Sequence, residues 1–204
     1  MRASGLSSYE LTKEEEAALD LFDNDNYFRE YGLGEMFVSH NGNFDIKKSH
    51  INDNGNWVVT AGTNNHGILG KTDVGAKIFP PNTITIDMFG APFYRPFQYK
   101  MVTHARVFNL EPTFEINSKI GLFLCSSLHF LSKEFSYSNM CSWNKIKHKT
   151  IPLPTKNNAP DFIFMSTFIS AISKLVIKDV VDFAASKISA YERVIKQNKQ
   201  TNQI

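Results

Sequence analysis

The chain has 204 residues, 42% hydrophobic and 13% aromatic, which is enough for one sizeable core with an appendage and excludes a large multidomain protein. Its 22 Lys and Arg nearly balance its 20 Asp and Glu, and together with 17 Phe this composition excludes a disordered chain.

Targeting and redox signals are sparse. The two cysteines, Cys125 and Cys141, cannot build a disulfide framework, so we expect reduced thiols. The first residues lack a basic region followed by an apolar run, and the longest apolar stretch, residues 162–177, is too interrupted to span a bilayer. These features predict a soluble, cytoplasmic protein with no membrane partner.

Charge is distributed unevenly along the chain. Residues 1–40 hold nine acids and three bases, a balance of −6, which leaves eleven acids and nineteen bases, or +8, for residues 41–204. A basic body suits a polyanion, because each neutralised phosphate releases counterions. Scattered lysines can equally form a solvated face.

The first predicted element is a short acidic helix over residues 12–24. Thr12 followed by Glu15 fits a capping box, and apolar residues surround it. Such a helix either docks a partner or covers one edge of the core.

Short strand-like runs follow from Gly32 to Pro112. Residues 57–60, 83–88 and 101–107 are predicted strands, and residues 62–67 form a glycine-bounded turn or exposed loop. A helix is predicted over residues 117–131, where apolar residues share one face. Residues 133–156 then carry five bases and one acid, the sharpest basic patch.

The last element is a long helix that begins after Asp161, a predicted N-cap, and continues to about residue 197. At 1.5 Å per residue it would be roughly 55 Å long, about twice the reach of the domain beside it. A protruding apolar stripe needs a cover, which predicts a coiled coil with a second copy or a partner; the alternative is a helix that folds back over its own domain. The predicted dimerisation residues lie on this stripe: Phe168, Ile172, Leu175, Val176, Val180, Phe183, Ile188 and Tyr191.

Familiar catalytic motifs are missing. Residues 67–72 (GILGKT) lack the first glycine of a phosphate-binding loop, because Asn65 stands there. The six histidines show no metal-ligand spacing, and neither a Gly-x-Ser-x-Gly elbow nor a base methyltransferase motif occurs. The sequence thus predicts no metal and no cofactor.

A set of short stretches, in this order, resembles the DNA specificity (S) subunits of type I restriction-modification systems and of bifunctional restriction enzymes. The stretches are NGNFD (residues 41–45), TAGTNN (60–65), NTITI (82–86), FYRPF (93–97), FSY (135–137), IPLP (151–154) and PDF (160–162), which leads into the predicted long helix. Each stretch is weak alone, and their order over about 160 residues carries the resemblance.

The resemblance implies an α+β fold: a mixed α/β target recognition domain with a curved, mostly antiparallel sheet over residues 1–155, then one long dimerisation and spacer helix over residues 156–204 that pairs in an antiparallel coiled coil. Family members usually hold two such domains and two long helices. This chain holds one of each, which implies a half-subunit that forms a homodimer.

In function, the resemblance implies a non-catalytic subunit that reads one half of a bipartite double-stranded DNA site per chain. It implies recruitment of a separate DNA methyltransferase (modification) subunit and, in addition, a possible restriction subunit. Two identical readers imply a two-fold symmetric target.

Candidate DNA contacts follow from side-chain chemistry. Asn64, Asn65 and His66 can address base edges or merely form a turn, and Arg95 can reach guanine or phosphate or take a structural stacking role. Tyr137 and Trp143 can contact DNA or belong to the core. The residues assigned to phosphates are Lys71, Lys133, Lys145, Lys147 and Lys149.

Two other functions remain compatible with the sequence. Similar chains are sometimes described as masking proteins that silence an anticodon nuclease inside a restriction complex, and co-purification with a nuclease would favour this function. A free-standing enzyme built from scattered carboxylates and a lysine would keep its activity without any partner.

Overall fold

The computed structural model describes residues 9–201, with side chains described through Tyr191, and the fold is α+β. The chain divides into two compact units. Asn24–Ser166 forms one, and the other combines helix α1 (Lys13–Phe22) with the part of helix α6 (Phe162–Thr201) that starts at Thr167.

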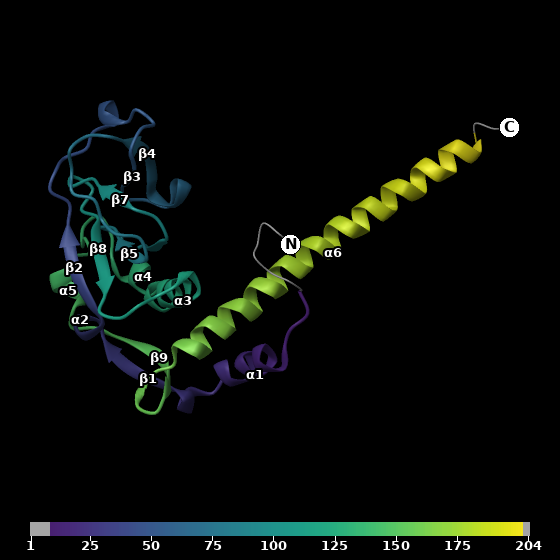
Figure 1. Cartoon of the computed structure of the whole chain (residues 1–204), viewed down its shortest axis with the longest axis horizontal. Coiled ribbons are helices and arrows are strands. Elements are labelled where there is room, and N and C mark those ends of the chain that lie inside the picture. The colour runs from purple at the N-terminus through teal and green to yellow at the C-terminus, as the bar shows by residue number, and fades with distance from the viewer. Residues whose placement is uncertain (1–8, 202–204) are drawn as a thin grey trace. The chain divides into compact units, whose positions relative to one another are not determined.

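Asn24–Ser166 contains three small sheets (Figure 1). The central sheet is antiparallel and has the order β2 (Phe37–Asn41), β8 (Phe108–Pro112), β5 (Thr83–Ile86) and β6 (Pro92–Arg95). A second sheet has the order β4 (Ile68–Thr72), β3 (Asn56–Val59) and β7 (Tyr99–Met101), and β3 pairs with β7 in parallel. The third joins β1 (Phe28–Gly32), β9 (Thr150–Lys156) and β10 (Ala159–Pro160), all antiparallel.

Within this unit the sheets are arranged along its length, with β3, β4 and β7 at one end, β1 and β9 at the other, and the central sheet between them (Figure 1). The helices are α2 (Leu33–Met36), α3 (Ser118–Leu128), α4 (Leu131–Glu134) and α5 (Trp143–Ile146), with 3₁₀ turns η2 (Asp25–Tyr27), η3 (Lys48–His50) and η4 (Asn64–Gly67).

The core explains why these segments hold together. All four residues of β5 are buried, and helix α3 packs beside β5 and β6. Gly121 makes this approach possible, because a Cβ at that position would lie 2.2 Å from the Tyr94 ring. In the core cluster of the second sheet Phe79 stacks on Tyr99 of β7 with ring centroids 5.4 Å apart, and the Tyr99 hydroxyl accepts a hydrogen bond from Asn109.

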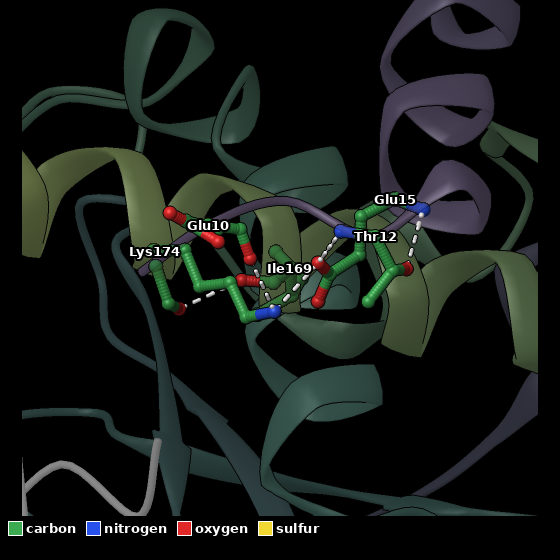
Figure 2. Close-up of polar contacts among 6 residues, drawn as sticks. Glu10, Thr12, Glu15, Ile169 and Lys174 are labelled. Atoms are coloured by element: carbon green, nitrogen blue, oxygen red, sulfur yellow. Dashed lines mark hydrogen bonds and ion pairs between the residues drawn. The ribbon is translucent and has the colours of Figure 1, made fainter. Parts of the chain in front are cut away.

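The helical unit is held by a buried ion pair (Figure 2). Glu15 completes the capping box of α1 with Thr12, and its Oε2 atom also lies 2.7 Å from Lys174 Nζ on α6. Lys174 donates a second hydrogen bond to the Glu10 carbonyl oxygen. Phe22 stacks on Phe168 with ring centroids 4.2 Å apart. Helix α1 therefore covers part of α6 through both apolar and charged contacts.

The predicted helices are confirmed at residues 12–24, 117–131 and 161–197, with small shifts at their ends. Asp161 accepts a hydrogen bond from Phe164 N at 2.9 Å, as expected of an N-cap. At 40 residues, α6 is about 60 Å long. No helix in the described part of the chain is long and apolar enough to cross a membrane.

One detail differs from the sequence prediction. The predicted strand over residues 101–107 is wrong, because β7 ends at Met101 and β8 begins at Phe108. Arg106 between them has a positive φ of 50°, which no strand allows.

Candidate nucleic-acid interface

One end of the central sheet gathers the loops that carry polar side chains. Asn41 pairs with Phe108, Phe108 pairs with Ile86, and Ile86 pairs with Pro92, so β2, β8, β5 and β6 all have a terminus at this end. The β2 arrow in Figure 1 points toward it. Loops that leave these strands therefore meet at one edge, which we call the reading end.

A cavity of about 840 Å³ opens at the reading end. Tyr137, Trp143 and Lys145, three of the predicted DNA contacts, line it together with Asn41 and Arg106. Tyr137 is 76% exposed, which excludes the core alternative for this side chain. Lys145 donates hydrogen bonds to Asn139 Oδ1 and to the Met140 carbonyl oxygen, both at 2.8 Å, so its ammonium group is held at the rim.

A second cavity, of about 670 Å³, is lined by the loop after β3, the turn after β5 and the start of β6. His66, Phe93 and His129 contribute to its lining, and so does the Asp87 carboxylate. Asp87 is buried and accepts hydrogen bonds from the backbone amides of Gly62, Phe89 and Ala91, which ties the loop after β3 to the end of β5. The same turn also contacts the lining of the first cavity, because the Met88 carbonyl oxygen accepts from Cys141 N.

Residues 63–66 form the exposed part of the loop between β3 and β4. Asn65 and His66 are both left-handed, with φ values of 47° and 52°. The Asn65 side chain donates to the Ile68 carbonyl oxygen at 3.1 Å, so its amide nitrogen takes part in the turn while its Oδ1 atom is an acceptor. The loop thus has a backbone fixed by a side-chain hydrogen bond and polar side chains that are exposed.

Arg95 does not lie at the surface. It is 2% exposed, and its Nε donates to Thr85 Oγ1 at 2.9 Å while Nη1 donates to the His66 carbonyl oxygen at 2.8 Å. Its guanidinium lies 5.0 Å from the Phe93 ring centroid. Arg95 therefore has the structural stacking role that the sequence left open and is not presented to guanine or phosphate. Burial lowers the pKa of Arg95 to about 10, so the group stays protonated near neutral pH.

The remaining predicted phosphate contacts are spread over several elements. Lys71 lies over the Trp57 ring at 4.6 Å, Lys133 is exposed on α4, and Lys147 follows α5 and is half-buried. Lys149 forms an ion pair with Glu134 at 2.7 Å, which already neutralises its charge. Only Lys145 of the five lines the first cavity.

Sequence reasoning missed Arg106 and Asn41 as parts of this end. Arg106 is exposed and lies in the loop that was predicted to be a strand. The sequence offers no clear signal for this loop, because residues 104–107 (HARV) alternate between polar and apolar as a strand does.

Thiols and metal-binding groups add no further site among the described residues. Both cysteines are free thiols, and burial raises the pKa of each to about 12, so neither is a thiolate at neutral pH. Within residues 9–201, no three His, Cys, Asp or Glu side chains lie close enough to hold a metal ion.

Most of the predicted dimerisation residues are exposed on α6. Val176, Val180, Phe183, Ile188 and Tyr191 are 58–69% exposed, and Ile172 and Leu175 are partly covered at 37% and 38%. Phe168 differs, because it stacks on Phe22 of α1.

An α+β unit that ends in a long helix is the fold of restriction-modification specificity subunits. The S subunit of a type I system from M. genitalium matches with a TM-score of 0.53 and 18% identity, over 87% of this chain and 49% of the relative. The HsdS subunit from Thermoanaerobacter tengcongensis matches with a TM-score of 0.53 and 16% identity, over 84% and 44%.

The family itself follows from the sequence match. The model described as "Type I restriction modification DNA specificity domain" matches residues 27–182, and the chain belongs to this family. A curated relative, the specificity subunit S.BcgI of a type II restriction enzyme from Heyndrickxia coagulans, is 25% identical over 130 residues, 63% of this chain and 38% of the relative. The chain thus spans half or less of the length of these relatives.

Proposed function

We propose that this chain binds double-stranded DNA in a sequence-specific manner and serves, without catalytic activity of its own, as the specificity component of a restriction-modification system. The observation that carries the proposal is the reading end, where Arg106, Tyr137 and Lys145 line one cavity in a chain of this family.

Phosphate binding is assigned to the cations around the first cavity. Arg106 and Lys145 line this cavity beside Tyr137 and Asn41, which supply neutral hydrogen-bond groups for sugar and phosphate oxygens. Lys71, Lys133 and Lys147 add positive charge on neighbouring elements. Lys149 contributes less, since Glu134 already pairs with it.

Base reading is assigned to the loop of residues 63–66. Asn64 and Asn65 carry amide groups that match the donor and acceptor pair of adenine in the major groove, and His66 offers a donor or an acceptor. Because residues 63–66 are exposed while the loop is anchored by Asp87 and Arg95, these side chains are presented from a fixed backbone.

Assembly is assigned to the exposed stripe of α6. A second copy of the chain, with its α6 antiparallel to the first, would cover Val176, Val180 and Phe183 and remove apolar surface from water. Two copies would read two half-sites of a symmetric target, and the paired helices would set the spacing and recruit a methyltransferase subunit and a restriction subunit.

The DNA-binding proposal is tested by mobility shift on the full chain, alone and with its cognate modification subunit, against a random duplex pool. Selection from the pool should recover one preferred sequence. Equal affinity for every duplex at moderate salt would contradict the proposal.

Charge reversal at the cavity rim locates the phosphate contacts. Lys145→Glu and Arg106→Glu should each weaken binding to all duplexes. Each should also reduce the slope of log K against log salt concentration by about one, the value for one phosphate contact. Lys156→Glu is the matched control, because it reverses an exposed charge on β9 in the same unit, away from both cavities. Equal losses in all three variants would mean that only net charge matters.

A further inference from the structure

The loop of residues 63–66 contains two consecutive left-handed residues. Asn65 and His66 are consecutive, are not glycine, and both have positive φ values, of 47° and 52°. Asn and His enter this region more readily than most L-residues, but they do so as single residues, so two neighbours together need surrounding contacts that fix the backbone. The contacts that fix it therefore determine where the exposed side chains point.

Arg95 supplies a side-chain contact to the second of these residues. Its Nη1 donates to the His66 carbonyl oxygen at 2.8 Å, and its guanidinium lies over Phe93, whose ring meets the His66 ring edge-on at 6.0 Å. Arg95 thus touches His66 at the backbone and, through Phe93, at the side chain. Gly67 is also close, since a Cβ there would lie 3.4 Å from Arg95 Nη2.

The environment of Arg95 is poorly suited to a purely stabilising role. The side chain is almost completely buried, and within the described residues it forms no ion pair; its Nη2 atom has no hydrogen-bond partner. The Asp87 carboxylate acts on Arg95 only through space, and a buried guanidinium without a direct ion pair is costly, whereas an apolar side chain of similar length would pack there without that cost. An unpaired buried donor beside a strained loop calls for an explanation other than stability.

We propose that Arg95 is the positioning residue for base recognition: it fixes the left-handed turn at Asn65 and His66 and so determines which bases this loop accepts. Arg95 acts through the loop and does not touch the DNA. This inference rests on the proposed function, because it assumes that the loop reads base edges.

The test compares cognate and random duplexes by equilibrium binding of the full chain, with the cognate duplex taken from the selection described above. Arg95→Met should lower affinity for the cognate duplex by about tenfold, the cost of one lost base contact, and leave the affinity for random duplexes and the salt slope unchanged. Arg95→Lys, which keeps the charge but not the fork of donors, should lose nearly as much.

The matched control is Lys100→Met. Lys100 is also a buried cation that donates to backbone carbonyl oxygens, those of Thr72 and Val74, which lie outside the loop of residues 63–66. Its loss should lower the melting temperature and leave the ratio of cognate to random affinity unchanged. A similar loss of this ratio in both variants would show general destabilisation and overturn the proposal.

A double-mutant cycle separates positioning from packing. Asn65→Ala should lower cognate affinity in the wild-type chain and have little further effect in Arg95→Lys, because an unpositioned loop no longer aims that side chain. Additive effects would overturn the proposal. A fall in the salt slope of Arg95→Met would also overturn it, since that result indicates a direct phosphate contact.

Thr85→Val covers the case in which the Arg95 variants do not fold. It removes only the hydroxyl that accepts from Arg95 Nε, at 2.9 Å, and should lower the cognate to random ratio by a smaller factor, about threefold. An unchanged ratio in this variant would overturn the inference. If the wild-type chain itself prefers no duplex, the proposed function fails instead.

Discussion

Two stretches of α6 with the same apolar periodicity have different surroundings. Residues 167–174 pack against α1, with Ala171 fully buried and Lys174 paired with Glu15 (Figure 2). Residues 175–191 leave most of their apolar side chains exposed, including Phe183 at 61%. A helical stripe therefore predicts burial of a face but does not say whether the cover comes from the same chain.

The covered stretch also contains the more specific contacts. Its ion pair links the capping box of one helix to a side chain 159 positions away, so α1 is fixed both along and around α6. The open stretch presents apolar side chains at helical spacing, with Lys187 near Phe183 at 4.6 Å. Burial of apolar surface alone can drive the open stretch to pair with another helix. The contact between α1 and α6, in contrast, is defined by the geometry of its ion pair.

The largest expected effect is on the open stretch. Val180→Asp combined with Phe183→Asp should weaken self-association by about 1,000-fold, or about 4 kcal/mol, because a coiled-coil seam would bury two carboxylates. Sedimentation or light scattering over a concentration series measures this. The unfolding of the Asn24–Ser166 unit should not change.

Ala185→Asp is the control for that experiment. Ala185 is exposed and lies about 200° around the helix from Phe183, on the opposite face. The Ala185→Asp variant should self-associate like the wild-type chain. A wild-type chain that is monomeric at micromolar concentration would remove the assembly proposal altogether.

A smaller but still large effect is expected in the covered stretch. Lys174→Met removes the cation from beside the buried Glu15 carboxylate and should destabilise the contact between α1 and α6 by about 3 kcal/mol. Hydrogen exchange of the α1 amides measures the loss locally, and association through residues 175–191 should be retained.

Adding Glu15→Gln to Lys174→Met sharpens this prediction. The glutamine keeps the side-chain acceptor of the capping box but removes the uncompensated charge, so the double variant should regain at least half of the lost protection. No recovery would mean that the packing of the Lys174 stem, not the charge pair, holds the helices together.

Local signals made α1, α3 and α6 predictable from the sequence. Thr12 with Glu15 and Asp161 are caps whose partners lie within one turn, and the apolar spacing of α6 persists over many residues. The reading end was only partly predictable. Tyr137, Trp143 and Lys145 come near Arg106 through long-range contacts, such as the hydrogen bond from Cys141 N to the Met88 carbonyl oxygen, which no local signal reveals.

Arg95 shows a second limit. Its position between Tyr94 and Pro96 is compatible with a surface role and with a structural role. Nothing nearby in the sequence reveals that Arg95 donates hydrogen bonds to Thr85 and to the His66 carbonyl oxygen. Arg106 shows a third, since its positive φ is imposed by the loop and not by its own preference.

The smallest expected effect tests whether the cap contributes independently of the ion pair. Thr12→Ala removes the hydroxyl that accepts from Glu15 N at 3.3 Å, and should cost about 1 kcal/mol of α1 stability. Thr12→Ser keeps the hydroxyl and should behave like the wild type in hydrogen exchange. A loss in Thr12→Ala as large as that in Lys174→Met would show that the cap orients Glu15 toward Lys174, because the shared carboxylate would then make the two contacts one cooperative unit.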